Sequence, residues 1–272
     1  MTRYAPVPPT LFRRLIFAVG MRAYPDKVAA LYGPIEDWDV SQVTDMSDAF
    51  AFPVAAALTG PVHTRVDLSR WDTSRVTTMA RMFSRAADFD ADLGGWDVSR
   101  VTDMTEMFRG TEAFRGRGLE RWNVGRVTVF SGMFAAATRF DADLGNWDVS
   151  RATRMTGMFM NTEAFRGRGL ERWDVSRVTT MAGMFCDAEG LATDGLLDDW
   201  DVGRVAYMNR MFFGVRAWGY GQLLRVVRPD ADCTEMADEE DEDEEDEEED
   251  EEAPPPTYVR PARALPVSGL LG

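Results

Sequence analysis

The sequence predicts an α/β tandem-repeat protein, in which seven similar units stack into a solenoid that an acidic tail follows. Three observations lead to this prediction. A tryptophan recurs at intervals of 25 to 27 residues after a first interval of 33, and the residues around it recur with it. A run of 15 acidic residues lies near the C-terminal end. Recurrence at such periods is typical of architectures in which each unit buries its apolar face against the next unit.

Each unit begins at its tryptophan, which we number as position 1 of the repeat. Position 9 is Met or Phe and position 13 is Phe in all seven units, and position 6 is Val in six of them. We expect Trp to stack on Trp and Phe on Phe in one continuous core. The tryptophans are Trp38, Trp71, Trp96, Trp122, Trp147, Trp173 and Trp200. The phenylalanines are Phe50, Phe83, Phe108, Phe134, Phe159, Phe185 and Phe212.

The local pattern predicts one short strand and one short helix in each unit. Thr102 is a candidate N-cap, and Met104 and Phe108 follow at helical spacing, which predicts a helix of two or three turns. Residues 89–96 are predicted to be a short strand or an extended segment. A right-handed stack of coils with one strand and one helix each is the leucine-rich-repeat type of architecture. The first unit has about eight extra residues around 53–63, which we expect in a surface loop.

Both ends of such a stack need a cover, because a solenoid otherwise exposes an apolar face and a sheet edge. We expect an N-terminal helical cap over residues 1–34, the seven-repeat solenoid over 35–214 and a C-terminal cap over 215–234. Residues 235–272 are acidic and then proline-rich, and we expect them to be disordered. The acidic run 238–252 carries 15 of the 16 net negative charges, so the repeats are nearly neutral.

The sequence offers few residues for catalysis or for holding a cofactor. His63 is the only histidine, and it lies in the insertion of the first unit. Cys186 and Cys233 are too far apart for a zinc motif, and we expect both to be free thiols. Gly116 and Gly118 are interpreted as turn residues rather than as a phosphate-binding loop. We therefore expect no enzymatic activity, no metal site and no cofactor.

Two polar positions also recur with the repeat. Position 2 is Asp in six units, and we expect each Asp to bond the backbone amides of the turn that follows; a row of calcium sites is the alternative. Position 5 is Arg in six units, and we call this set the Arg stripe: Arg75, Arg100, Arg126, Arg151, Arg177 and Arg204. One interpretation is that the stripe pairs with the Asp residues. The other is that it binds an anionic partner, or the protein's own acidic tail.

The segment 96–108, W-D-V-S-R-V-T-D-M-T-E-M-F, resembles the BspA-like repeat of the DUF285 family. The resemblance covers about residues 30–215. That family is similar to leucine-rich-repeat surface proteins. The resemblance therefore implies a solenoid that is used for protein binding or adhesion, and it implies no catalytic residues.

We expect a non-enzymatic, monomeric scaffold that binds another protein, whose identity the sequence does not give. A surface-displayed adhesin and a purely structural protein without a specific ligand are the alternatives. The acidic tail is a candidate site for basic proteins, and we expect neither nucleic-acid nor membrane binding. No segment has the roughly 18 apolar residues of a membrane helix. No clear signal peptide or anchor is present either, which favours an intracellular location over surface display.

Overall fold

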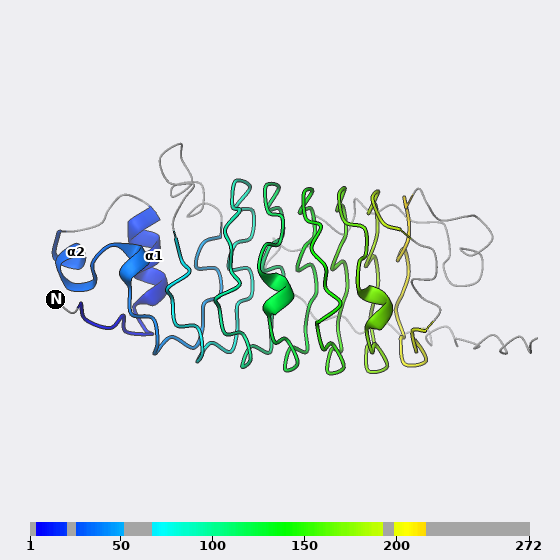
Figure 1. Ribbon diagram of the computed structural model, residues 1–272, viewed down its shortest axis with the longest axis horizontal. Helices are drawn as coiled ribbons and strands as arrows, with labels where there is room; N and C mark the ends of the chain where they lie inside the picture. Colours follow the sequence, from blue (N-terminus) through cyan, green and yellow to red (C-terminus); the bar gives the residue numbers. More distant parts are fainter. Residues whose placement is uncertain (1–3, 21–25, 52–66, 193–198, 216–272) are drawn as a thin grey trace, which may run out of the picture.

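The computed structural model describes residues 4–20, 26–51, 67–192 and 199–215. Its helices are α1 (Phe12–Gly20) and α2 (Asp26–Tyr32), followed by the short 3-10 helices η1 (Ile35–Asp37), η2 (Leu119–Arg121) and η3 (Leu170–Arg172). Figure 1 shows the repeats side by side along the longest axis of the molecule, with α1 and α2 at the N-terminal end. The expected insertion loop, the acidic tail and, apart from Val215, the expected C-terminal cap lie outside the described residues.

Successive repeats are joined through their backbones in parallel register. Position 8 of each described repeat forms a parallel bridge with position 8 of the next repeat. Around these bridges, amides at positions 9, 11 and 13 donate to the next repeat. For example, the Met79 amide donates to the Asp103 carbonyl at 3.0 Å, and the Arg81 amide donates to the Thr105 carbonyl at 2.7 Å. A single repeat therefore lacks partners for much of its backbone, and neighbouring repeats supply them.

The helix predicted after Thr102 and the strand predicted over 89–96 are not found. The backbone after Thr102 makes successive tight turns, with φ of 52° at Glu106 and 66° at Gly110. A right-handed helix excludes left-handed residues at this spacing, and the amides donate to the next repeat instead of to residue i−4. The Thr102 hydroxyl donates to the Thr77 carbonyl at 3.2 Å, so it does not cap a helix. Residues 89–96 are turns and irregular backbone.

Aromatic rings stack through the interior of the array. The ring centroids of Phe108 and Phe134 lie 5.7 Å apart with the planes 4° from parallel, and those of Phe134 and Phe159 lie 5.7 Å apart at 11°. Trp147 and Trp173 stack at 6.5 Å and 2°. All seven tryptophans and all seven position-13 phenylalanines are buried. The prediction that like rings stack on like is confirmed for the whole phenylalanine row and, among the tryptophans, for the stretch from Trp122 to Trp200.

Each buried indole N–H between repeats finds a backbone acceptor. Trp147 Nε1 donates to the Leu119 carbonyl at 2.8 Å, and Trp173 Nε1 donates to the Leu144 carbonyl at 3.1 Å. The acceptor lies three residues before the tryptophan of the preceding repeat, and the same bond recurs in the other repeats after the first. A buried indole needs such a partner. This bond therefore fixes the register between repeats, and it explains why position 1 is Trp rather than Phe.

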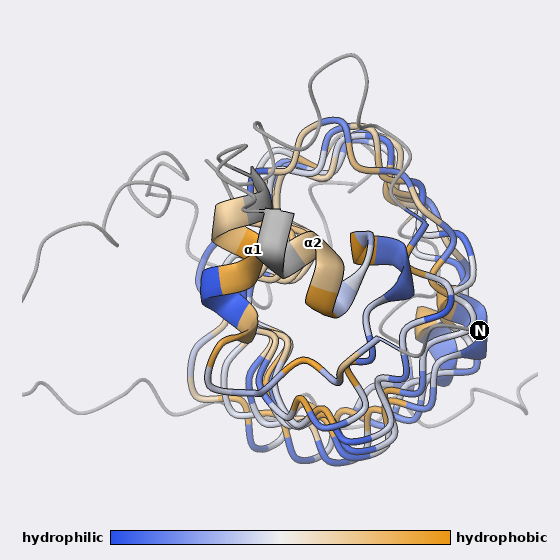
Figure 2. Cartoon of the chain, turned by 90° about the vertical axis from the view of Figure 1, so that its left-hand side faces the viewer, coloured by the Kyte–Doolittle hydropathy of each residue, from blue (hydrophilic) through white to orange (hydrophobic). Residues whose placement is uncertain are grey.

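The two N-terminal helices cover one end of the array. Figure 2 looks along the array from that end and shows α1 and α2 across the outline of the coils. Phe12 and Ile16 of α1 are fully buried, and the Phe12 ring packs edge-on against Trp71 with centroids 5.7 Å apart. Arg13 of α1 forms an ion pair with Asp48 at 3.0 Å. These helices therefore shield the apolar face that the first repeats would otherwise expose.

The expectation of a free thiol at Cys186 is wrong. The sulfur of this residue belongs to a disulfide, and the side chain is fully buried at position 14 of the sixth repeat. Cys233 lies outside the described residues.

Candidate binding surface

The Arg stripe lies on a turn that recurs in every repeat. Positions 3 to 6 form this turn, which a backbone hydrogen bond closes, such as that from the Val101 amide to the Val98 carbonyl at 2.9 Å. The arginine at position 5 is the third residue of the turn, and the apolar residue at position 6 is buried beneath it. All six members of the Arg stripe are exposed. The turn therefore presents a guanidinium group to solvent at the same point of six coils.

The side chain at position 2 holds this turn in place. Asp148 Oδ1 accepts the Ser150 amide at 3.1 Å, and the same bond recurs in the other repeats. In the fourth repeat, the Asn123 side-chain oxygen accepts the Gly125 amide at 3.3 Å. The prediction that these residues bond the following turn is confirmed. The part of the chain that the structure describes contains no group of three or more His, Cys, Asp or Glu side chains that could hold a metal ion.

Hydrogen bonds to the turn lower the pKa of several of these carboxyl groups. For Asp72, Asp148 and Asp174, the serine hydroxyl two residues later is the largest cause, and the amide of the same serine is the next. A carboxyl group whose folded pKa is lowered stabilises the fold above its unfolded pKa. That contribution is lost as the pH falls through the folded pKa. The turn therefore weakens in acid.

Replacing Asp72, Asp148 and Asp174 together by Asn is expected to reduce the loss of stability on going from pH 7 to pH 3. Asparagine keeps an acceptor oxygen, as Asn123 shows, but it has no carboxyl group that would be protonated in acid. Urea unfolding midpoints at the two pH values measure the effect. The matched Asp→Ala variant removes the acceptor and is expected to be less stable at both pH values. An equal acid-induced fall in the Asn variant and the wild type would contradict the role of these carboxylates.

The stripe has no ion pair within the described ranges. The expected pairing with the Asp residues at position 2 is not among the ion pairs found there, and the stripe's one side-chain hydrogen bond is from Arg75 Nη1 to Gln42 Oε1, at 2.6 Å. Other arginines of the repeats do pair, as Arg117 does with Asp90 at 3.1 Å. The Arg stripe is therefore a line of solvated cations whose donors are available to an external anion.

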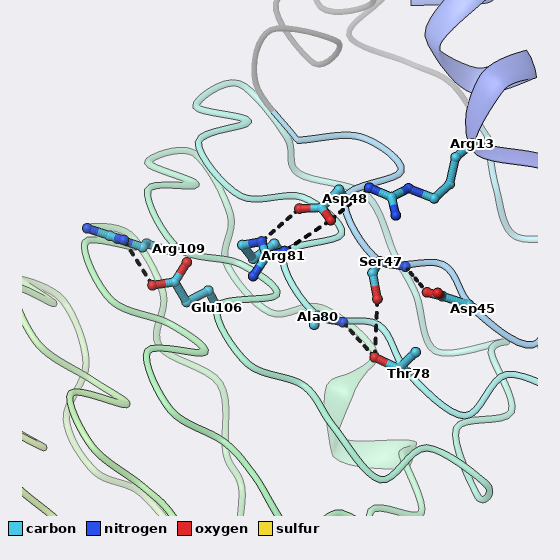
Figure 3. A network of polar contacts seen from close by, with 9 residues as sticks. All are labelled: Arg13, Asp45, Ser47, Asp48, Thr78, Ala80, Arg81, Glu106 and Arg109. Carbon is cyan, nitrogen blue, oxygen red and sulfur yellow. Dashed lines mark hydrogen bonds and ion pairs between the residues drawn. The ribbon is translucent and has the colours of Figure 1, made fainter. Parts of the chain in front are cut away.

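A second line of charge, at position 11, was not predicted from the sequence. Asp48 accepts hydrogen bonds from Arg81 Nε at 2.8 Å and Nη2 at 3.2 Å, and from Arg13 Nη2 at 3.0 Å (Figure 3). In the third repeat, Glu106 pairs with Arg109 at 2.9 Å, and both side chains are largely buried. We call the three residues at position 11 and their two partners, Arg13 and Arg109, the charged row. Its signal in the sequence is a departure from the period, because position 11 is charged in the first three units, glycine in the next three and arginine in the last.

The remaining candidate residue, His63, lies outside the described residues. Among the residues whose structure is described, no helix has the length and apolar character needed to cross a membrane.

Comparison with known families gives a match that covers the repeats. The family model described as "Mycoplasma protein of unknown function, DUF285" matches residues 19–114, 55–168 and 132–222, which together span more than half of the 272 residues. No curated protein matches the chain. The matched ranges contain all seven tryptophans of the repeat.

Proposed function

Because the chain belongs to the DUF285 family, whose description gives no function, we propose from its surface that it is a non-enzymatic repeat scaffold. Its ligand is an acidic segment of a partner protein, bound along the Arg stripe by a monomer. The observation that carries this proposal is the line of six exposed arginines without an ion pair in the described structure. The proposal includes a repeat solenoid, which the resemblance to BspA-like repeats supports, but one whose described coils do not each have the strand and helix of the leucine-rich-repeat type.

The chemistry of the stripe favours carboxylates. A guanidinium group binds a carboxylate through two parallel hydrogen bonds, which gives a geometric preference as well as a charge attraction. Each exposed contact contributes about 0.2 to 1 kcal/mol, so useful affinity requires several contacts at once. Six arginines at one repeat position provide them. The resulting affinity falls with salt, since exposed charges are screened over about 10 Å at 0.1 M.

The layout of the stripe also supports binding rather than catalysis. An active site brings a nucleophile, a base and a stabilising donor together around one reacting atom. The stripe instead repeats one residue type once in each of six coils, so its members form a line. A line of identical contacts suits an extended ligand.

The triple variant Arg100→Ala/Arg126→Ala/Arg151→Ala is expected to weaken the binding of an acidic peptide about tenfold at low salt. Three lost contacts of about 0.5 kcal/mol each amount to this factor. The probe is a fluorescent peptide with the sequence of residues 238–252, measured by anisotropy at 20 and 300 mM salt. Both the full chain and a chain ending at residue 235 are tested, and weaker binding by the full chain would indicate that its own acidic run competes.

A matched control removes the same number of charges elsewhere. Arg117→Ala/Arg121→Ala/Arg168→Ala replaces three exposed arginines that pair with carboxylates, and we expect it to change binding less than threefold. Equal losses of peptide affinity in the two triple variants would show that only the net charge matters, and would contradict binding along the Arg stripe. If a single-stranded oligonucleotide bound more strongly than the peptide, the ligand of the stripe would be a nucleic acid rather than an acidic protein segment. Thermal melts establish that both variants fold.

A further inference from the structure

The surface next to the charged row is hollowed where glycine takes over position 11. Gly132 and Gly157 have φ of 60° and 58°, close to the 52° of Glu106. The backbone therefore keeps the same conformation in these repeats, but position 11 no longer carries a side chain. A Cβ added to Gly157 would have its nearest neighbour, the Met160 Cβ, 4.0 Å away. We call the resulting cavity of about 120 Å³ the trough. Its sides are formed by Thr105, Ser131, Thr156, Ala135 and Met160.

Ala135 and Met160, which line one side of the trough, belong to an apolar row that continues beyond it and is shielded from solvent. Ala135, Met160 and Cys186 occupy position 14 of three successive repeats and form a cluster separate from the main core. Their exposed fractions are 3, 8 and 0%, whereas Phe213, at the same position of the last repeat, is 37% exposed. The row is continuous, because the amide at position 15 of one repeat donates to the carbonyl at position 14 of the next repeat. For example, the Ala136 amide donates to the Met160 carbonyl at 2.7 Å. Small apolar clusters that are buried apart from the main core lie under a covering segment of chain.

The disulfide at Cys186 identifies that segment. The chain has two cysteines, so the other half of this bond within one chain is Cys233. Cys233 follows Val215, the last described residue, by 18 residues. An extended chain of that length spans about 60 Å, which is enough to return from the last repeat to the sixth. We propose that the residues flanking Cys233 dock in the trough and are tied there by a Cys186–Cys233 disulfide.

The sequence of the docked segment matches the spacing of the trough. Residues 231–236 read A-D-C-T-E-M, with Met236 three residues after Cys233. Three extended residues span about 10 Å, which equals two spacings of about 4.8 Å between neighbouring strands. A segment tied at Cys186 is therefore long enough for Met236 to reach the level of Ala135, two repeats earlier. The small residue Thr234 fits a trough whose floor is glycine. The Ser131 hydroxyl group offers a partner to the backbone of the segment, whereas the hydroxyl groups of Thr105 and Thr156 already bond Asp103 and Thr180.

The first test maps the disulfide in the full chain. Glutathione disulfide is the oxidant, and it takes two electrons and two protons from the two thiols to give two glutathione thiols. Digestion without reduction, followed by mass spectrometry, is expected to give one linked peptide pair containing Cys186 and Cys233, which a thiol reductant removes. Alkylation of both cysteines in the oxidised, unfolded chain would overturn the proposal.

The second test asks whether the segment lies in the trough. Hydrogen exchange over residues 130–138 and 155–162 is expected to be at least threefold faster in the reduced chain and in Cys233→Ser than in the oxidised chain, with residues 96–104 unchanged. Gly157→Asn fills the trough and is expected to speed reduction of the disulfide. Arg81→Asn, at the same repeat position and in the same left-handed backbone (φ 54°) but outside the trough, is expected to leave that rate unchanged. A linked peptide without these differences in exchange, or equal reduction rates in the two Asn variants, would show that the segment is tethered but not docked.

Discussion

Replacing Trp147 by alanine is expected to lower the free energy of unfolding by about 3 to 5 kcal/mol and the melting temperature by roughly 10 °C. The side chain is 3% exposed and stacks between Trp122 and Trp173, each with its centroid 6.5 Å away. Its loss leaves a cavity between two coils. It also leaves the Leu119 carbonyl without the indole donor at 2.8 Å, and a buried acceptor without a partner costs a further part of this energy.

Urea and thermal unfolding, followed by circular dichroism, measure this effect. Arg151→Ala is the matched control, because Arg151 lies in the same repeat and is exposed without an ion pair in the described structure, and it is expected to stay within about 0.5 kcal/mol of the wild type. Trp147→Phe keeps most of the packing and removes the hydrogen bond, so it is expected to fall between the two. Equal stability of Trp147→Ala and the wild type would contradict the coupling of repeats through the tryptophan row.

The core could be predicted from the sequence because it repeats. Trp147 and Phe134 each belong to a row in which the same residue type recurs at one position, and identical residues in stacked units meet each other. The helix could not be predicted in the same way. The spacing of Met104, Met107 and Phe108 fits a helix, but it also fits a tight turn in which the Met107 amide donates to the Met104 carbonyl at 3.2 Å. Glycine at position 11 in three units, including Gly132, was the available signal of left-handed backbone.

The same contrast holds for the candidate site. The Arg stripe was visible because position 5 recurs, and its exposure follows from its place on a turn next to a buried valine. The ion pair between Arg81 and Asp48 joins residues 33 apart that share a repeat position but not a residue type. Its members, and those of the Glu106–Arg109 pair, depart from the repeat pattern. A consensus of the repeats does not contain such residues. They nevertheless give one coil ion pairs that the other coils lack.

Gly118→Ala is expected to cost about 3 kcal/mol or more, because the new methyl group would have no space. Gly118 has φ of 88°, which L-residues with a Cβ rarely adopt. Its Cβ would overlap the backbone nitrogen of Gly94 in the preceding repeat and would lie 2.6 Å from the Gly94 Cα. Backbone atoms in a packed array do not move aside as the end of a flexible side chain does, so the two coils must separate.

Gly95→Ala is the matched control for this variant. Gly95 adjoins Gly94, but its φ is not positive, and its Cβ would have its nearest neighbour, the Ser69 carbonyl oxygen, at 3.4 Å. We expect it to change the stability by less than about 1 kcal/mol. Gly169 approaches Gly145 in the same way two repeats later, so Gly169→Ala is expected to reproduce the loss. Urea midpoints for the three variants decide the matter: a Gly118→Ala chain as stable as Gly95→Ala would mean that the repeats do not need this close approach of their turns.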